Sequence, residues 1–366
     1  MERIKISFCA DGDSNTGSYR IPFVWIKDIL LSKNFNCVDN IIDSSVNFYF
    51  CKAGQNIASK IKKIDKNAII FLFKPHYEID VDLSFTNPFK FIFRFIAFFF
   101  ECIFKFKQKK FDKDICSSEI LIADTKKLGL FYKTKYDKKV LYLRLLEKID
   151  INAKYGISKK IEKENEIIFL FHGAIKHYNE NFPELKALLE TASRYKFVRF
   201  VCISDIQKIQ KKISLKNVKS EYYPYDFDTL IKFLKIAHLG YVPNFLRPRI
   251  PFLKNIYNYI NFKFYQLNIY NIAEKNSSNA GRAYLYASFG IPFLAHPTRE
   301  IIADFSKIEE LEFPNDTAEA NYFLKKLISN KNLYSSISNK LLTLSDKYSL
   351  EQEVEKIIKL LYVYKE

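Results

Sequence analysis

The chain has 366 residues, of which 48% are hydrophobic. That is enough for a core in each of two domains, and it excludes a disordered or fibrous protein. The formal net charge of +17 requires an anionic partner or surface, and nucleic acid, lipid headgroups and phosphorylated substrates would all satisfy it. Six scattered cysteines form no C-x-x-C pair, and no leader sequence precedes the first expected strand. These features favour reduced thiols, no zinc site and a cytoplasmic protein.

The first half of the chain alternates short apolar runs with helical stretches, which predicts a parallel sheet of the α/β class. The first run, Ile4 to Ala10, leads into the loop Asp11 to Ser18 and then into a helix expected from Pro22 to Lys33. This order of strand, small-residue loop and helix is typical of the start of a mononucleotide-binding fold. Further strands are expected at Val46–Cys51, Ala68–Phe73, Ile120–Ala123 and Val140–Leu143.

The second half repeats this plan after a polar, charged stretch over 149–165, where we place a linker. Strands are expected at Ile167–Phe171, Val198–Ile203, Leu239–Val242 and Ile291–Ala295, with helices at Phe182–Tyr195 and Phe227–Ile236. The tail from Leu350 to Val363 predicts an amphipathic helix. We therefore expect domains at 1–150 and 166–345, followed by a C-terminal helix in 346–366.

The segment from Asn276 to Thr298 carries the most specific pattern. It predicts a polar loop, a helix over Ala283–Phe289 that Gly290 ends, and a buried strand. The N-terminus of such a helix, beside Arg282, favours a phosphate or diphosphate, because the helix dipole, the backbone N–H groups and the guanidinium all select an anion. The same strand-turn-helix pattern also occurs as plain scaffold.

This pattern resembles the donor-nucleotide site of glycosyltransferases with the GT-B architecture, which has two Rossmann-like domains facing each other across a cleft and a C-terminal helix that returns to the first domain. The residues that carry the match are Ser278, Asn279, Arg282, Ala287, Ser288, Gly290, Ile291 and Pro292. The segment lacks the pair of glutamates common in retaining members, since no acidic residue follows Asn279 before Glu300. The resemblance therefore does not extend to stereochemistry.

Two further stretches support the resemblance. Residues 120–125 and 140–143 look like the last two strands of an acceptor domain, and Ala237 to Pro243 looks like the strand that lines the donor cleft, although His238 stands where the family has an aspartate. The loop from His172 to His177 resembles the family's glycine and basic-residue loop, with a solvated turn as the structural alternative. The donor-binding residues that the resemblance implies are Gly17, His172, Gly173, Lys176, Pro243, Ser278, Asn279, Ala280, Gly281 and Arg282.

Two residues of the first domain are candidate general bases for an acceptor hydroxyl, if the reaction inverts configuration. Asp13 lies in the loop after the first strand, and His76 follows an apolar strand at the edge where ligands of such folds bind. Acidic loop residues more often only form turns. No metal site and no cofactor are implied, because basic residues and a helix end can stabilise a leaving diphosphate.

The segment over 89–110 predicts an amphipathic helix. Its charged and small residues fall on one helical stripe, and the opposite surface is almost wholly Phe and Ile. Charges at Lys90, Arg94, Glu101 and Lys105 interrupt any run of about twenty apolar residues, which disfavours a membrane span. A helix lying among anionic headgroups and a helix buried in the core both fit the pattern.

The sequence thus predicts a glycosyltransferase of the capsule or surface polysaccharide type. It would move a sugar from a nucleotide diphosphate sugar to a polysaccharide or lipid-linked glycan, as a cytoplasmic protein peripheral to the inner face of the cell membrane. Nucleic acid is not an expected partner, because no helix-turn-helix, zinc or RNA-binding motif accompanies the positive charge. Transfer of a non-sugar, phosphoryl-type group on the same fold and basic nucleic-acid binding are the alternative functions.

Overall fold

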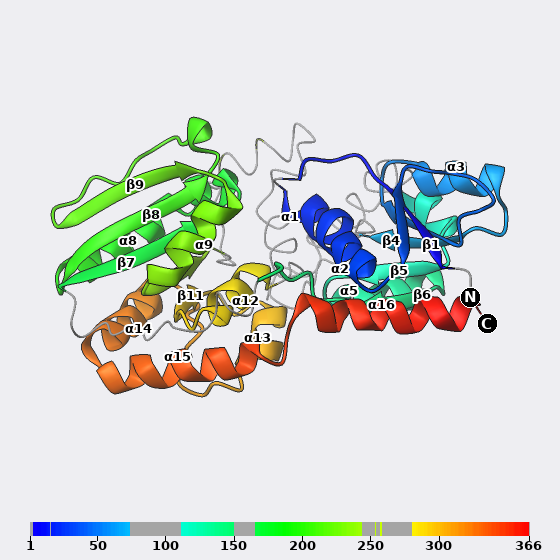
Figure 1. Ribbon diagram of the computed structural model, residues 1–366. Helices are drawn as coiled ribbons and strands as arrows, with labels where there is room; N and C mark the ends of the chain where they lie inside the picture. Colours follow the sequence, from blue (N-terminus) through cyan, green and yellow to red (C-terminus); the bar gives the residue numbers. More distant parts are fainter. Residues whose placement is uncertain are drawn as a thin grey trace. The chain divides into compact units, whose positions relative to one another are not determined.

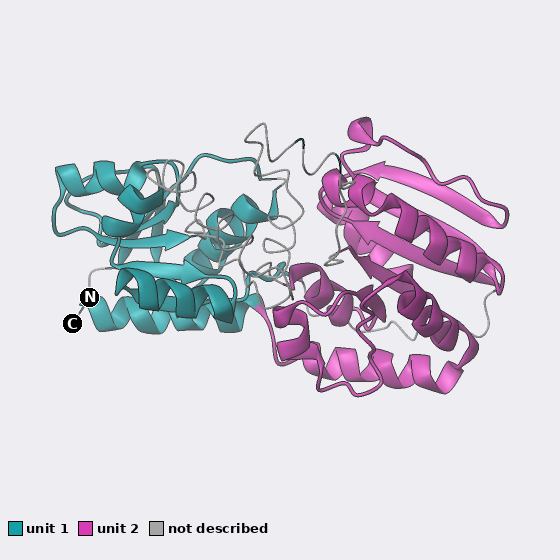
Figure 2. Cartoon of the chain, turned by 180° about the vertical axis from the view of Figure 1, so that it is seen from behind, with its two compact units in different colours: residues 1–148, 250–279, 350–366 teal, residues 149–249, 280–349 magenta. Residues whose placement is uncertain are grey.

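The chain divides into two compact units in a computed structural model that describes residues 3–14, 16–73, 111–149, 165–243, 253, 257 and 280–365 (Figure 2). Unit 1 comprises residues 1–148, 250–279 and 350–366, and unit 2 comprises residues 149–249 and 280–349. The end of the chain therefore belongs to the unit that contains its beginning.

Unit 1 contains a sheet of parallel strands in the order β2-β1-β3-β4-β5-β6 (Figure 1). Each strand expected from the first half of the sequence is present, with ends within two residues of the expected ones, and β2 is an addition at the sheet edge. The strands are β1 (Lys5–Cys9), β2 (Asn36–Asp39), β3 (Phe48–Lys52), β4 (Ile69–Phe73), β5 (Ile120–Ala123) and β6 (Lys139–Tyr142).

The first helix of unit 1 begins earlier than the sequence predicts. Residues 17–32 run through α1 (Gly17–Tyr19), the π-helix η1 (Arg20–Trp25) and α2 (Ile26–Ser32), although a start at Pro22 was the expectation. Proline lacks the N–H group that an α-helix needs in its interior, and a π-helical stretch changes the hydrogen-bond spacing around it. The wide turn therefore accommodates Pro22 inside one continuous helical segment.

Helices cover both faces of the first sheet. On one face, α3 (Ile57–Ile64) and α5 (Lys126–Tyr136) pack against alternate residues of the central strands, and Cys51 and Leu72 are fully buried there. On the other face, Phe8, Phe50 and Phe73 form an aromatic layer, and Phe23 from η1 packs edge-on against Phe73 with ring centroids 5.6 Å apart. Apolar residues on both faces explain why these strands have continuous apolar sequences.

The C-terminal helix α16 (Leu350–Lys365) packs against α2 within unit 1. Its buried carboxylate Glu353 accepts a hydrogen bond from the Arg144 backbone N–H at 3.1 Å and pairs with the Arg144 guanidinium at 3.4 Å. Lys356 donates to the same carboxylate at 2.5 Å. The return of the C-terminal helix to the first domain, predicted from the resemblance, is confirmed.

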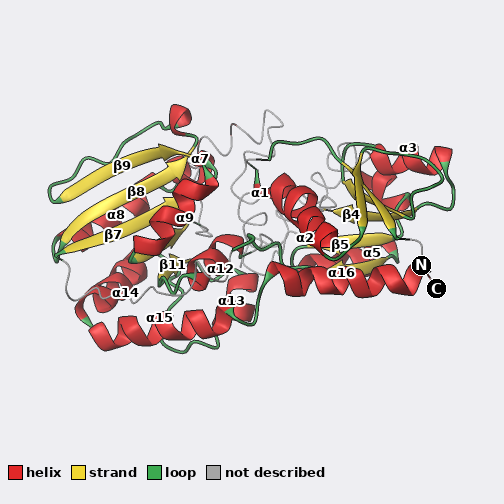
Figure 3. Cartoon of the chain, in the orientation of Figure 1, coloured by secondary structure: helices red, strands yellow, loops and turns green. Residues whose placement is uncertain are grey.

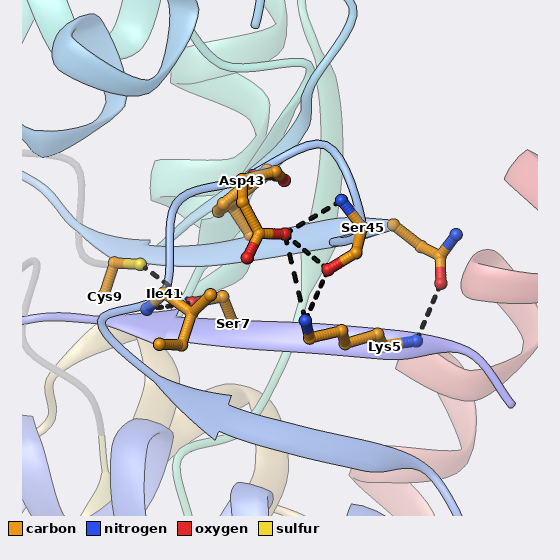
Figure 4. A network of polar contacts seen from close by, with 8 residues as sticks. Lys5, Ser7, Cys9, Ile41, Asp43 and Ser45 are labelled. Carbon is orange, nitrogen blue, oxygen red and sulfur yellow. Dashed lines mark hydrogen bonds and ion pairs between the residues drawn. The ribbon is translucent and has the colours of Figure 1, made fainter. Parts of the chain in front are cut away.

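A polar network ties the segment after β2 to Lys5 and Ser7 of β1 (Figure 4). Lys5 pairs with Asp43 at 3.8 Å and donates to Ser45 at 2.5 Å. Ser7 accepts from the Ile41 backbone N–H at 3.1 Å. These contacts fix the loop between β2 and β3 relative to β1.

Unit 2 contains a second parallel sheet, in the order β11-β10-β7-β8-β9 (Figure 3). Its strands are β7 (Glu166–His172), β8 (Phe197–Ser204), β9 (Val218–Pro224), β10 (Leu239–Val242) and β11 (Phe293–Ala295). Its helices are α7 (Ile175–Glu180), α8 (Phe182–Ser193), η3 (Ile206–Lys208), α9 (Phe227–Ile236), α12 (Gly281–Ser288), α13 (Arg299–Phe305), α14 (Thr317–Ser329) and α15 (Lys331–Ser345). Two α/β units with parallel sheets confirm the predicted fold class. Within the described residues, no helix is both long and apolar enough to cross a bilayer.

We expect Glu353→Ala to destabilise unit 1 by about 3 kcal/mol, because it leaves the Arg144 guanidinium and backbone N–H without their shared buried partner. Scanning calorimetry of the full chain should show a lower transition temperature. Glu355→Ala is the matched control, since Glu355 pairs with Lys33 at the surface, where both side chains are more than 40% exposed. Equal shifts for the two variants would contradict this account.

Candidate functional site in unit 2

The candidate site of unit 2 lies at the point where the strand order of its sheet reverses. Counted within the unit, the order is 3-2-1-4-5, and the first and fourth strands, β7 and β10, are hydrogen-bonded neighbours. Ligands of open parallel sheets bind beyond the carboxyl ends of the strands at such a switch point. His172 and Gly173 end β7 there, and the buried Pro243 follows β10.

Gly173 is held in a conformation that other residues rarely adopt. Its φ is +118°, its N–H donates to the Ile203 carbonyl at 3.1 Å, and its own carbonyl accepts from the Ser204 hydroxyl at 2.5 Å. A Cβ atom on Gly173 would lie 2.7 Å from Nε of Arg282. Two of the predicted donor-binding residues, 109 positions apart in sequence, are therefore in direct contact through the space that glycine leaves open.

Helix α12 lies close against β10 because Gly240 has no side chain. A Cβ atom there would lie 2.7 Å from the Tyr286 ring, and the Tyr286 hydroxyl donates to the Leu170 carbonyl of β7 at 2.8 Å. The predicted end of the helix is confirmed, since Gly290 has a φ of +59°. At the other end, the N-cap position is Ala280, and no side chain caps it. The polar loop expected before the helix, Asn276 to Asn279, lies outside the described residues.

Arg282 is the cation of this site. It lies in the first turn of α12, near the rings of Tyr241 and Tyr286, and burial lowers the pKa of its guanidinium. No ion pair joins it to a carboxylate in the part of the chain that the structure describes. An arginine stays charged in proteins, so a desolvated guanidinium is stabilised by any anion that reaches it. The arrangement therefore favours an anion over a neutral group beside Arg282.

Three of the four histidines of unit 2, His172, His238 and His296, are buried and have structural contacts. His238, which stands where the family has an aspartate, is buried, and its Nδ1 accepts from the Ile168 backbone N–H at 3.0 Å. Nδ1 of His296 lies 3.0 Å from the Pro314 carbonyl. His172 is buried at the end of β7, with its ring edge-on to Tyr286 at 5.3 Å. Of these three, only His172 lies beside Arg282 and Gly173 in the chain's candidate site.

Lys176 lies near Gly173 in sequence but extends into solvent. It is on α7, its side chain is 61% exposed, and its Nζ is 3.7 Å from Glu180 one helical turn later. An exposed lysine with one weak ionic partner can turn toward a bound anion, so its role in binding stays a prediction.

Two of the candidate residues of unit 1, Asp13 and Gly17, follow the carboxyl end of β1. Asp13 is exposed, and its backbone carbonyl accepts from the Thr16 N–H at 2.9 Å and the Thr16 hydroxyl at 2.8 Å. Gly17 begins α1, and a Cβ there would have ordinary contacts, the nearest at 3.8 Å. The loop is fixed by Gln55, which accepts from the Asp11 N–H at 3.1 Å and donates to the Asp11 carbonyl at 2.7 Å.

An ion pair that the sequence did not reveal supports the same loop. The Arg20 guanidinium binds Glu147 at 2.8 Å and the Ser14 carbonyl at 3.2 Å, and it lies 4.9 Å from the Trp25 ring. Burial raises the pKa of Glu147, and the charge of Arg20 opposes this effect. The pair anchors the loop at Ser14 to the chain segment after β6.

Three candidate residues, His76, Ser278 and Asn279, lie outside the described residues, as does the segment 89–110. Sequence reasoning also missed Gly240, Tyr241 and Tyr286. Tyr286 is four residues after Arg282, which places both side chains on one face of α12, so helical spacing could have identified it. Among the described residues, no group of three or more His, Cys, Asp or Glu residues could hold a metal ion.

Two parallel α/β units whose chain returns to the first through a C-terminal helix define the GT-B fold. Comparison with solved structures supports this assignment of the fold. WaaG, a glycosyltransferase involved in lipopolysaccharide biosynthesis, is 12% identical with a TM-score of 0.58 and covers 97% of this chain and 99% of its own. Anabaena Alr3699/HepE, in complex with UDP and glucose, is 10% identical with a TM-score of 0.59 and covers 99% and 100%.

Apo OtsA is 11% identical with a TM-score of 0.56, covering 98% of this chain and 99% of its own. No protein-family model and no curated protein sequence matches the chain. At these identities the likeness concerns the fold, and it extends over nearly the whole chain.

We expect Gly173→Ala to destabilise unit 2 by about 2 kcal/mol, because the new Cβ meets the Arg282 guanidinium and the backbone φ is strained for alanine. Gly129→Ala is the control. A Cβ at Gly129 would make ordinary 3.6 Å contacts, and alanine in helix α5 should be neutral or stabilise by up to about 1 kcal/mol. Calorimetric transitions measured for both variants test the difference; a Gly173→Ala chain as stable as the wild type would show that Arg282 does not need this space.

Proposed function

We propose that the protein is a glycosyltransferase that takes a sugar from a nucleotide diphosphate sugar. The observation that carries the proposal is the Arg282 guanidinium, which lies over Gly173 at the switch point of a parallel sheet and has no ion-pair partner among the described residues. A diphosphate supplies the missing negative charge, and charge-assisted bonds from arginine to phosphate are strong and directional.

The geometry suggests a division of labour within unit 2. Gly173, Ala280 and Gly281 would allow the phosphates close to backbone, while His172 and Pro243 would border the site. Arg282, together with Lys176 if it turns inward, would stabilise the negative charge that builds on the diphosphate as the glycosidic bond breaks. Ser278 and Asn279 are proposed donor contacts on the strength of the sequence resemblance. This electrostatic catalysis does not depend on a metal.

For the acceptor, we propose a polysaccharide or lipid-linked glycan of the surface polysaccharide type, reached at the cytoplasmic face of the membrane. The net charge of +17 and the pattern over 89–110 support an anionic membrane surface as the partner. Asp13, in the exposed loop that Gln55 and Arg20 hold, is the candidate base within the described residues, and His76 is the alternative.

Replacing Arg282 with alanine should weaken nucleotide diphosphate binding by about tenfold or more, because a hydrogen bond to a charged group contributes about 1.5 to 3 kcal/mol. Affinity for the nucleoside alone should hardly change. A thermal-shift screen over UDP, GDP, ADP, dTDP and CMP would first identify the nucleotide, and calorimetry would then compare the variants.

The matched control is Arg194→Ala. Arg194 is an exposed arginine of the same unit that follows α8 at the amino end of the sheet, away from the switch point. If Arg282→Ala and Arg194→Ala both bind the diphosphate as the wild type does, the donor site is not at α12.

Of Asp13 and His76, we expect one to be the acceptor base. Its replacement by alanine should lower turnover by about a hundredfold or more and leave donor affinity unchanged. Transfer assays and nucleotide calorimetry on both variants test this. Full transfer activity in both would mean that neither residue accepts the proton.

The segment 89–110 should bind anionic membranes, with phenylalanines at the acyl boundary and lysines on the phosphates. Each lysine near such a surface contributes about 1 kcal/mol, and this part should fade with salt. Changing Phe95, Phe98 and Phe99 to serine should release the chain from anionic vesicles in a flotation assay. If the wild-type chain does not bind vesicles at low salt and the serine variant unfolds, the segment is a core helix and the membrane proposal is wrong.

A further inference from the structure

A pocket of about 360 Å³ lies in unit 1, at the carboxyl ends of β1 and β2. Its floor is formed by apolar side chains of β1 and of the helical segment that follows, and its rim is polar. Pockets for small ligands begin at about 300 Å³ and combine an apolar lining with a few placed polar groups. Ligands of parallel sheets bind at the carboxyl ends of the strands, so this pocket lies where a binding site is expected.

The rim of the pocket combines an aromatic face with hydroxyl-binding groups. Tyr19 supplies a partly exposed ring, and Asp28, Asp39 and Asn40 supply carboxylate and amide groups. Lys27 forms an ion pair with Asp39. The rim thus has two carboxylate groups and one amino group, so it disfavours an anion. Carboxylates and amides accept or donate to hydroxyl groups, and an aromatic face packs on apolar C–H groups.

The aromatic wall is held in place by a close contact. The Tyr19 ring lies against Gly12, where an added Cβ would be 2.3 Å from a ring carbon, and it stacks on Phe23 with ring centroids 5.5 Å apart. The ring therefore has a defined position only because Gly12 has no side chain.

The opposite wall is equally fixed. Asp39 ends β2, and Asn40 donates its backbone N–H to the Phe8 carbonyl of β1 at 3.1 Å in a left-handed turn with φ +53°. The residues that follow are tied to β1 by the contacts of Ser7 and Lys5 (Figure 4). Both walls of the pocket are thus preorganised, which lowers the entropy lost on binding.

We propose that this pocket binds one uncharged sugar unit of the acceptor glycan, with an apolar ring face on Tyr19 and its hydroxyl groups on Asp28, Asp39 and Asn40. The assignment of this sugar to an acceptor rests on the proposed glycosyl transfer. The carbohydrate site itself is argued from the pocket alone. The rim has more carboxylate groups than amino groups, which favours an uncharged sugar over a uronic acid or a phosphorylated sugar.

Saturation-transfer NMR on the full chain without nucleotide tests the proposal. The probes are the methyl glycosides of glucose, galactose, mannose and N-acetylglucosamine, with methyl glucuronide as the anionic counterpart. At least one uncharged glycoside should receive saturation on its ring protons and outcompete the glucuronide. Tyr19→Ala and Asp39→Asn should each weaken its binding about tenfold, in line with the loss of a stacking face or of a charged hydrogen-bond partner.

Two further variants sharpen the result. Gly12→Ala removes no lining residue but displaces the Tyr19 ring, so it should weaken glycoside binding while its thermal transition shows that the chain is folded. Tyr195→Ala, which removes an exposed tyrosine of unit 2, should bind as the wild type does. The proposal is overturned if no uncharged glycoside receives saturation, if the glucuronide binds as well, or if a folded Gly12→Ala or Tyr19→Ala variant binds unchanged. If a glycoside binds but Arg282→Ala binds the nucleotide diphosphate as the wild type does, the result contradicts the proposed transferase function and still supports the carbohydrate site.

Discussion

The close approach of α12 to the second sheet is the constraint on which the candidate donor site depends. Gly240 lets the Tyr286 ring lie against β10, and the Tyr286 hydroxyl then reaches the Leu170 carbonyl of β7. One helical turn earlier, the same helix carries Arg282 across Gly173. A side chain at either glycine would move the helix outward and take the guanidinium away from the edge of the sheet. The packing of a helix on two strands thus sets the position of a charge.

The charge at Arg282 contrasts with the other arginines that the structure places among packed side chains. Arg20 pairs with Glu147, Arg144 with Glu353, and Arg199 with Glu221, whose pKa Arg199 lowers to about 2. In each case a carboxylate compensates the cation. Such compensation is the general rule for buried charges, because an unpaired one is costly. The guanidinium of Arg282 departs from this rule at the switch point of a sheet, and the proposed donor site is based on that departure.

The sequence predicted every central strand and the edge strands β6 and β11, but it missed the edge strands β2 and β9. Strands such as β3 and β7 are covered on both faces and have continuous apolar sequences, whereas β2 and β9 lie at sheet edges, are half exposed and contain mainly polar or alternating residues. For the candidate site, too, the sequence predicted some features and missed others. Arg282 and Gly173 stand out within short motifs, but their contact, like that of Gly240 with Tyr286, joins segments far apart in the chain and has no local signature.

The return of α16 to unit 1 also determines the order in which the chain can complete its folding. Val354, Ile357 and Leu361 are buried in a helix that is synthesised after all of unit 2, while the rest of unit 1 that the structure describes comes mostly from residues 1–148. During translation, the N-terminal sheet and its helix α2 must wait, with apolar surface uncovered, until all of unit 2 has emerged. Domains otherwise tend to fold from the N-terminus as they appear. Here unit 2 has every residue it needs before unit 1 does, and α16 completes unit 1 only after unit 2 has been synthesised.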